Sequence, residues 1–395
     1  MSWPMISLGE LVDIKGGGTP DKSNSEYWNG EIPWASVKDF KKNTIDSTLD
    51  SITPLGVKNS ATSVIPAGNI IIPTRMALGK VAINTIDLAI NQDLKALFIK
   101  DNNVVDRGYL FRWLESQSSL IESEGKGATV KGITLPFLQG LKVPIPPLNE
   151  QKRIAVILDK AENILQKREK TIKLADDFLH ATFLEIFGDP VKNPKGWKKD
   201  KIKEGVLDIT SGWSASGENT PCKSGEFGVL KISSVTSGVF KAEENKVVDS
   251  KNIPASKKLV IPKKGDLLFS RANTRELVAA ICMVHQDYNN LFLPDKLWSI
   301  KLNHDLLLPE FFLILIQNEK VRELLTKQAT GTSGSMLNIS KSKFEETEII
   351  FPEINVQKDF CNAFRKIINL KEKLIESNEL ADKSFNSLSQ KVFLQ

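Results

Sequence analysis

Basic and amide side chains beside predicted turns are the residues of this chain with the clearest chemical use. An Arg side chain can donate two hydrogen bonds to guanine and Asn can pair with adenine, whereas Lys more often holds a phosphate. Arg75 and Arg271 stand out because each ends a strand-like run, VIPAGNIIIPTR or VIPKKGDLLFSR. We interpret them as one position in two related segments. The candidate nucleic-acid contacts are Lys15, Thr19, Lys22, Arg75, Lys80, Lys126 and Lys131 in the first half, and Trp213, Lys231, Arg271, Asn273, Arg275, Ser333, Lys341 and Lys343 in the second.

A solvated surface role remains an alternative for each of these Lys residues. Trp34 and Trp298 are expected to lie in the core and not to stack on bases. The formal net charge of +5 is a mild bias that is compatible with a nucleic-acid partner without requiring one.

Motifs that would indicate catalysis are missing from the sequence. It contains no GxxxxGKS/T phosphate loop, no HExxH, no GxSxG and no Gly-rich dinucleotide loop. A base methyltransferase would carry an Asn/Asp-Pro-Pro-aromatic turn, which neither DPV at 189–191 nor NPK at 193–195 provides. Asp106, Glu124 and Lys126 could form a metal-dependent nuclease set, so a nuclease remains an alternative. The three His and three Cys residues are scattered, and no metal site or disulfide is predicted.

Two long heptad stripes would position the candidate loops. Apolar residues alternate at spacings of four and three, which is typical of a coiled-coil helix. This predicts helices at 149–188 and 354–395, with Asn149 and Asn355 as N-caps. The first stripe includes Ile154, Leu158, Leu165, Arg168, Ile172, Leu179 and Ile186, and the second includes Phe360, Phe364, Ile367, Leu374, Asn378, Phe385 and Leu388.

The segments before the two helices repeat one order of motifs, with a period of roughly 200 residues that indicates a tandem domain duplication and not a solenoid. Short β-rich runs bounded by Gly and Pro alternate with one or two helices, near 109–124 in the first copy and 309–327 in the second. The predicted fold class is therefore α+β, with mixed domains at 1–148 and 189–353.

Connectivity predicts how the two helices pair. The second domain begins where the first helix ends, and it ends where the second helix begins. A compact domain usually keeps its termini close together. The helices should therefore be antiparallel, with the domains at opposite ends of a rod of ~58 Å and an approximate two-fold axis between them. In this register Ile154 faces Val392, and Arg168 and Asn378 form one polar layer that fixes the alignment.

The whole chain resembles the DNA specificity subunit of type I restriction-modification enzymes. The motifs that carry the resemblance are GGGTP at 16–20, YWNGEIPWASVKD at 27–39, TRMALGKVAI at 74–83, NQDL at 91–94, PIPPLNEQKRIAVIL at 144–158 and FLEIFGDPVKNPKGW at 183–197. The second copy departs from this pattern, since SRANTRELV replaces TRMALGKV and PEINVQ replaces PPLNEQ.

The resemblance implies a non-catalytic subunit with two target-recognition domains, each reading one half of a split sequence in double-stranded DNA, and a helical spacer that sets the gap. It implies no cofactor in this chain. Two methyltransferase subunits would use S-adenosylmethionine, and restriction subunits would translocate and cleave DNA with ATP and magnesium.

Composition favours a soluble globular protein, with 41% hydrophobic and 26% charged residues. No apolar run reaches the 18 or so residues of a membrane span, and the first residues, MSWPMISLGE, do not resemble a signal peptide. We therefore expect a cytoplasmic location and no membrane partner. Besides the nuclease, a scaffold that binds only proteins remains an alternative.

Overall fold

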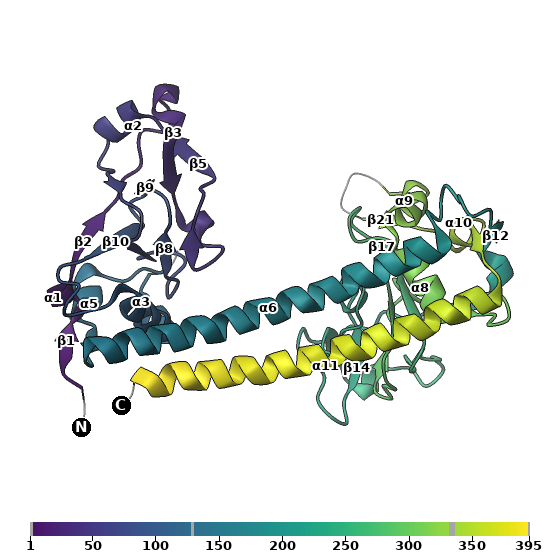
Figure 1. Ribbon diagram of the computed structural model, residues 1–395. Coiled ribbons are helices and arrows are strands. Elements are labelled where there is room, and N and C mark those ends of the chain that lie inside the picture. Colours follow the sequence, from purple (N-terminus) through teal and green to yellow (C-terminus); the bar gives the residue numbers. More distant parts are fainter. Residues whose placement is uncertain (1–2, 128–129, 332–335, 394–395) are drawn as a thin grey trace. The chain divides into compact units, whose positions relative to one another are not determined.

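The computed structural model describes residues 3–127, 130–331 and 336–393. The chain forms two compact units, Met1–Lys170 with Glu376–Gln395, and Thr171–Ile375. Each unit combines one mixed α/β domain with parts of two long helices (Figure 1). No helix of the described part is long and apolar enough to cross a membrane.

The first domain contains two mixed sheets. The larger sheet has the order β2-β10-β7-β8-β4, formed by Val12–Gly16, Leu94–Ile99, Ile70–Pro73, Ala82–Asn84 and Thr44–Ile45. The smaller has the order β5-β3-β9-β6, formed by Asp50–Ile52, Trp28–Ala35, Leu88–Ile90 and Val64–Ile65. A third, two-stranded pair joins β1 (Met5–Ser7) to β11 (Lys142–Pro144). β7 is buried on both faces, which explains its continuous run of Ile.

Short helices cover the strands of the first domain: α1 (Leu8–Leu11), α2 (Pro54–Lys58), α3 (Arg107–Ser116), α4 (Ser118–Ser123) and α5 (Leu135–Gly140), with 3₁₀ turns η1 (Ser25–Tyr27) and η2 (Val37–Asp39). The helix predicted near 109–124 is therefore divided in two at Gln117, which ends α3. Buried Tyr109 on α3 donates a 2.7 Å hydrogen bond to the Pro144 carbonyl and so ties this helix to β11.

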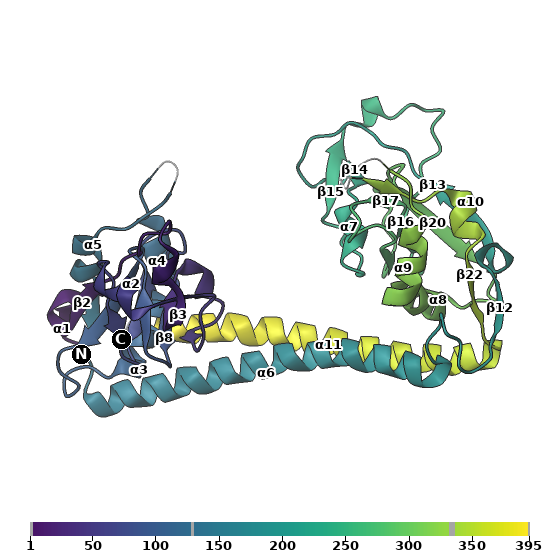
Figure 2. The same cartoon turned by 90° about the horizontal axis from the view of Figure 1, so that it is seen from above.

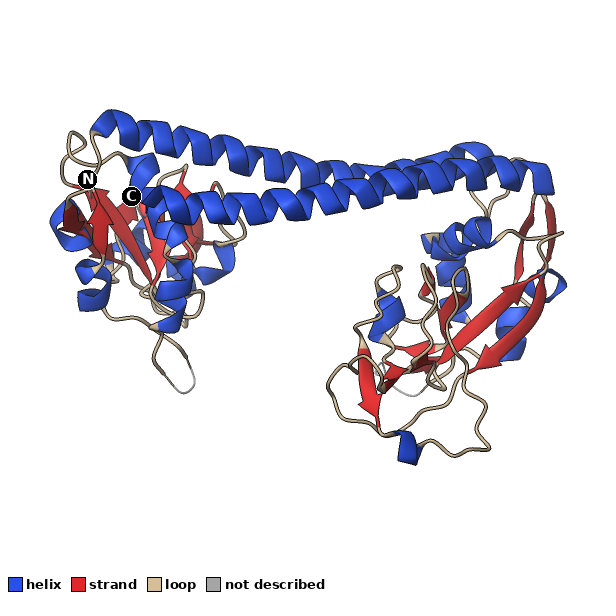
Figure 3. Ribbon diagram, turned by 90° about the horizontal axis from the view of Figure 1, so that it is seen from below, coloured by secondary structure: helices blue, strands red, loops and turns tan. Residues whose placement is uncertain are grey.

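The second domain also combines strands with short helices (Figure 3), and four strands of its main sheet follow the order of the first domain. Its main sheet has the order β13-β20-β16-β18, formed by Val206–Ser211, Leu297–Leu302, Leu267–Ser270 and Ile281–Met283. Smaller groups are β15-β14-β19 (Asn245–Val248, Phe227–Leu230, Leu291–Phe292), β12-β22 (Lys198–Lys201, Glu348–Phe351) and β17-β21 (Ala272–Asn273, Leu337–Asn338). The strands β13, β20, β16 and β18 correspond to β2, β10, β7 and β8, so the duplication is confirmed.

The helices of the second domain are α7 (Ser233–Thr236), α8 (Pro309–Gln317), α9 (Glu319–Lys327) and α10 (Lys341–Glu345), with 3₁₀ turns η3 (Ile202–Gly205) and η4 (Ser250–Asn252). The helix predicted at 309–327 is again divided, because Asn318 ends α8 and its side chain caps α9 by accepting from the Lys320 N–H at 3.1 Å. Trp34 and Trp298 are both buried, as predicted.

The two long helices are α6 (Leu148–Phe187) and α11 (Ile354–Phe393), each of 40 residues. The predicted N-caps are wrong by two residues: the carbonyls of Pro147 and Glu353 accept the first helical hydrogen bonds, so Asn149 and Asn355 lie inside the first turn.

A buried glutamine joins each long helix to its own domain. Gln151 accepts a hydrogen bond from the Asp106 N–H at 2.7 Å and donates to the carbonyls of Val104 and Pro146 at 2.9 Å. Gln357 does the same with the Leu308 N–H and the carbonyls of Leu306 and Pro352. These bonds account for the Gln that the two copies share at this point.

Contacts within each unit confirm that α6 and α11 are antiparallel (Figure 2). In the first unit, Arg168 donates 2.7 Å hydrogen bonds to the carbonyl and hydroxyl of Ser377. In the second, Lys371 bonds Asp176 at 2.5 and 2.7 Å, and Phe183 contacts Phe360 with ring centroids 5.6 Å apart. The polar layer predicted around Arg168 is present, but its partner is Ser377 and not Asn378.

Buried or half-buried positions follow the predicted stripes, at Ile154, Leu158, Leu165, Arg168, Ile172, Leu179 and Ile186 on α6 and Phe360, Phe364, Ile367, Leu374, Asn378 and Phe385 on α11. Leu388 is the exception, since its side chain is 37% exposed. The half-buried residue there is Ser389, one position later, followed by buried Phe393. A straight helix of 3.6 residues per turn drifts in this direction from a strict heptad.

Candidate functional site

Just after β7 lies an exposed basic side chain that was predicted from the sequence as a nucleic-acid contact. Arg75 forms a β-bridge with Gly132, and the Ile133 N–H donates to the Thr74 carbonyl at 2.9 Å. The Arg75 side chain is 65% exposed, and its only ion pair with the described residues is a 3.9 Å contact to Asp93. Its guanidinium therefore keeps most of its donors free.

A hollow of about 500 Å³ lies beside this strand end, and we call it the first-domain hollow. Two aromatic rings, Trp28 and Trp34, form one wall in an edge-to-face pair 5.1 Å apart. Its lining residues are Thr19, Lys22, Trp28, Trp34, Ser36, Val37, Lys38, Asp50, Met76, Asn91, Gln92 and Asp93. Polar groups beside the half-buried Trp28 ring suit recognition of a planar polar ligand such as a base.

Glycine is required where the hollow meets the strand β2. A Cβ atom on Gly17 would lie 1.9 Å from the Ile90 carbonyl oxygen. The neighbouring Gly18 N–H donates to the same carbonyl at 3.0 Å, and Trp34 donates to the Gly18 carbonyl at 3.0 Å. The GGGTP motif is thus explained by close backbone packing, which brings Thr19 to the rim.

The run Asn91-Gln92-Asp93 supplies part of the lining of the hollow. Thr19 donates to the Gln92 side chain, and Asn91 donates to the Asp93 carboxylate at 3.4 Å. Asn91, Gln92 and Met76 were not among the contact residues predicted from the sequence. A run of three side chains with amide and acid groups directly after a buried strand is the signal that could have found the first two.

The remaining first-domain candidates divide into two groups. Lys126 and Lys131 are exposed on the hairpin that pairs with Arg75, and the Lys131 carbonyl accepts from the Met76 N–H at 3.1 Å. Lys15 instead lies 4.6 Å from the centre of the Phe98 ring, and Lys80 donates to the Phe40 carbonyl at 3.1 Å. Only Thr19, Lys22, Arg75, Lys126 and Lys131 gather near the hollow and its adjoining hairpin.

Backbone pairing shows that Arg75 and Arg271 do not share one position, so that prediction is wrong by one residue. Pro73 faces Leu94 as Ser270 faces Leu297. One residue further along, the Thr74 carbonyl accepts from the Ile133 N–H in the first domain, and the Arg271 carbonyl accepts from the Ile339 N–H in the second. Arg271 therefore matches Thr74, and Arg75 matches Ala272. Neighbouring residues of a strand point to opposite faces, so the two Arg side chains differ in direction.

Arg271 accordingly uses its guanidinium inside the protein. It donates to the Asp295 carbonyl at 2.8 Å and to the Asn338 side chain at 2.9 Å, and it is only 25% exposed. These bonds join the loop before β20 to the hairpin that carries β21. The structure supports a stabilising role for Arg271, while its contact with DNA remains a prediction.

Other second-domain candidates also have protein partners. Trp213 stacks on Phe292 at 6.1 Å, with the Lys257 ammonium 5.7 Å from its ring. Lys341 donates to the Ile209 carbonyl at 3.2 Å and Lys343 to the Gln328 carbonyl at 2.8 Å. Four further candidates are half-buried Lys231 at the end of β14, Asn273 on β17, exposed Arg275 beside Glu276, and Ser333, which lies outside the described residues.

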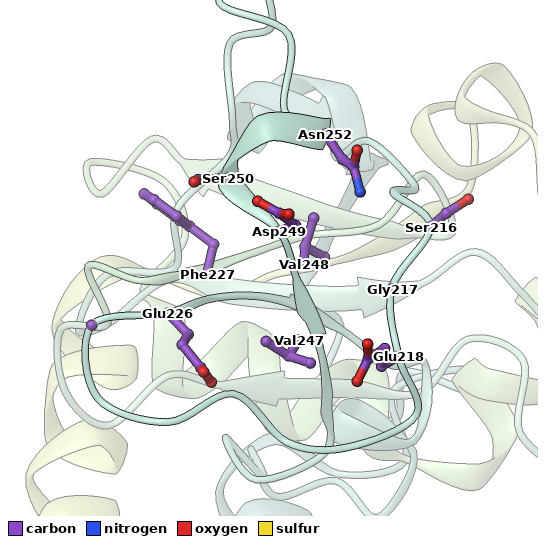
Figure 4. A pocket seen from close by; sticks show the side chains of 11 residues that line it. Ser216, Gly217, Glu218, Glu226, Phe227, Val247, Val248, Asp249, Ser250 and Asn252 are labelled. Carbon is purple, nitrogen blue, oxygen red and sulfur yellow. The ribbon is translucent and has the colours of Figure 1, made fainter.

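A larger hollow of about 850 Å³ in the second domain is acidic (Figure 4). Glu218, Glu226 and Asp249 line it, and two of these carboxylates accept loop N–H groups, from Lys223 at 2.7 Å and Lys251 at 2.9 Å. Negative charge disfavours phosphate here, so this hollow is not a candidate for nucleic-acid binding.

Of the residues considered as a nuclease set, Asp106 already has a structural role, because its carboxylate caps α3 by accepting from the Tyr109 N–H at 3.0 Å. Lys126 pairs with Gly132 through its main chain, and Glu124 is exposed. Among the described residues no group of three or more His, Cys, Asp or Glu is arranged to hold a metal ion. The geometry gives the nuclease alternative no support.

A charge cluster around buried Arg112 joins α3 to α6 in the first unit. Arg112 contacts Glu115 at 2.7 Å, Asp159 at 2.6 Å and Glu162 at 2.5 Å. Burial, reinforced by the nearby carboxylates and opposed by Arg112, raises the pKa of Glu115 from 4.5 to about 7. These ion pairs tie α3 to α6.

Comparison with known proteins places these features in context. Residues 2–174 and 194–380 match the family model of the type I restriction modification DNA specificity domain. The type I restriction enzyme EcoR124I/EcoR124II specificity subunit of Escherichia coli is 39% identical over 165 residues, covering 40% of this chain and 40% of that protein. The MjaIX specificity subunit of Methanocaldococcus jannaschii is 24% identical over 255 residues, covering 60% and 59%. The chain thus spans less than two thirds of the length of these two relatives.

Other matches extend over nearly the whole chain. The MjaVIII specificity subunit of Methanocaldococcus jannaschii is 23% identical over 412 residues, covering 98% of this chain and 91% of that protein. The crystal structure of a type I restriction-modification S subunit from M. genitalium has a TM-score of 0.58 at 14% identity, covering 99% and 96%. At this identity the structural match shows a shared fold.

Proposed function

The chain belongs to the type I restriction-modification DNA specificity family, and we propose that it selects the DNA sequence on which a type I enzyme acts. Each domain would read one half of a two-part target in double-stranded DNA, and α6 and α11 would set the gap between the halves. The chain would not be catalytic itself. Its site of action would be the cytoplasm, where the DNA lies.

The observation that carries this proposal is that one framework presents different side chains in the two domains. Gly212 retains the close packing of Gly17, since a Cβ atom there would lie 2.0 Å from the Leu293 carbonyl. At the strand end, however, Arg75 and Met76 in the first domain correspond to Ala272 and Asn273 in the second. A common scaffold with divergent exposed groups is expected of two domains that read different sequences.

The proposed partners supply the chemistry. Two methyltransferase subunits would bind the chain and transfer a methyl group from S-adenosylmethionine to adenine, and restriction subunits would use ATP and magnesium to translocate and cleave DNA. The family supports this assembly, and the sequence motifs of these reactions are absent from the chain.

Mapping methylated adenines tests the proposal. The chain would be expressed with its modification subunits in a host that lacks adenine methylation, and the methylated sites would be read across the genome. We expect one split motif with a fixed gap. Methylation of an undivided motif, or methylation that does not depend on this chain, would refute the proposal.

Binding measurements separate DNA recognition from protein scaffolding. The affinity of the assembled complex for a duplex with the mapped motif should fall steeply as salt rises, because phosphate contacts release counterions. An affinity that does not change with salt would favour the scaffold alternative.

A further inference from the structure

Met76 is an exposed apolar residue in an unfavourable backbone conformation. Its φ is +65° and its side chain is 55% exposed. The Ala77 N–H donates to the Arg75 carbonyl at 2.9 Å, so residues 75–77 form a three-residue turn centred on Met76. Turns of this kind with a positive φ are rare and strained for residues other than glycine.

Neighbouring segments hold this turn in place. The Met76 N–H donates to the Lys131 carbonyl at 3.1 Å, and Arg75 pairs with Gly132. The side chain contributes little to the core because more than half of it is exposed, and glycine would adopt the same backbone without strain. The stability of the domain therefore does not explain a methionine at this position.

The position of Met76 relates it to sequence reading. It lines the first-domain hollow with Gln92, Asn91 and Thr19, and it directly follows Arg75, whose side chain is 65% exposed. The equivalent residue of the second domain is Asn273, since Met76 hydrogen-bonds to Lys131 where Asn273 pairs with Leu337. The same point of the framework thus carries an apolar group in one domain and an amide in the other.

We propose that Met76 reads a thymine of the first half-site by contact with its C5-methyl group in the major groove. The inference rests on the proposed function. The methyl is the apolar feature of the major groove, and the surrounding Arg, Gln and Asn side chains suit the polar base edges read in the same groove. A flexible, polarizable thioether is adapted to such a contact.

Replacing thymine by uracil removes this methyl group alone and tests the contact. The complex of the chain with its modification subunits would be titrated with duplexes of the mapped motif in which each thymine is replaced in turn. We expect the wild type to bind about fourfold more weakly when one thymine of the first half-site is changed, which corresponds to one methyl-sized group. The same duplex should bind Met76→Ala no more weakly than the unmodified motif does.

Two further variants control for folding and for general loss of apolar surface. Met76→Gly relieves the strained turn and removes the side chain, so it should fold well and also lose discrimination of uracil. Met5→Ala removes a methionine that is equally exposed, at 55%, on β1 and outside the hollow. This variant should discriminate uracil as the wild type does.

An equal uracil effect in wild type and Met76→Ala, or no effect at any thymine of the first half-site, would overturn the proposal for Met76. In both cases selective binding of the mapped motif would remain. A complex that does not distinguish the mapped motif from unrelated DNA would instead refute the proposed function.

Discussion

Arg75→Ala and Arg271→Ala should have opposite consequences although both residues end a central strand. Arg271 makes two hydrogen bonds to protein acceptors and is 25% exposed, so its removal leaves the Asp295 carbonyl and the Asn338 amide without their donor. Two such bonds contribute roughly 2 kcal/mol. In a unit of this size that loss lowers the melting temperature by about 4 to 8 °C.

Arg75 has a single 3.9 Å ion pair and is 65% exposed, so Arg75→Ala should change stability by less than about 0.5 kcal/mol. Its effect should appear in DNA binding, as a loss of roughly 1 to 3 kcal/mol confined to the first half-site. Thermal unfolding of each variant and titration of the complex with duplexes altered in one half-site measure the two effects. If Arg271→Ala melts like the wild type, or if Arg75→Ala weakens both half-sites equally, the roles assigned from the backbone register are wrong.

Three further experiments test other parts of the structure. The pKa of Glu115 is about 7 in the folded state and near 4.5 in the unfolded state, so the folded state loses stability as pH rises through this range. Glu115→Gln should therefore stabilise the fold by up to roughly 3 kcal/mol at pH 8 and by little near pH 4.5. If urea unfolding shows the same increase in the free energy of unfolding at both pH values, this prediction is wrong. Asn378 Oδ1 is buried and accepts no hydrogen bond among the described residues, so Asn378→Leu should raise the urea midpoint. An unchanged midpoint would show that burial of this oxygen does not destabilise the fold. Gln357→Ala should lower the free energy of unfolding by at least roughly 2 kcal/mol, because the Leu308 N–H loses its buried acceptor. Replacing the exposed neighbour, Lys358→Ala, should leave it unchanged. Equal effects of the two variants would refute the role of Gln357 in joining the helix to its domain.

The long helices were predictable because a heptad stripe of this length has one structural interpretation, and a tandem repeat supplied the partner. Their deviations have local causes. Phe183 and Phe187 were missed since they leave the stripe to pack against Phe311 of the domain core. Leu388 lies outside the buried stripe of α11 because the helix drifts from a strict seven-residue repeat near its end.

The recognition surface was less predictable for a different reason. Motif matching aligned Arg75 with Arg271, but the direction of a strand residue depends on backbone pairing, which sequence similarity between diverged copies does not report. The contribution of Met76 depends on a positive φ, which is unexpected for methionine and has no signal in composition or periodicity. Asn91 and Gln92 become part of a site only when the strand β9 brings them beside Thr19.

The bridge between each strand end and its hairpin also bears on how such domains could change over time. In the first domain the pairing of Arg75 with Gly132 is held by main-chain hydrogen bonds from Ile133 to Thr74 and from Met76 to Lys131, whereas in the second domain the Arg271 side chain adds a bond to Asn338. In the first domain, inserting or deleting one residue before the bridge would therefore exchange the side chain that faces outward while leaving a main-chain pairing that does not depend on side-chain identity. A lineage could thus acquire a new target through a single codon gained or lost, in addition to substitution at the contact itself.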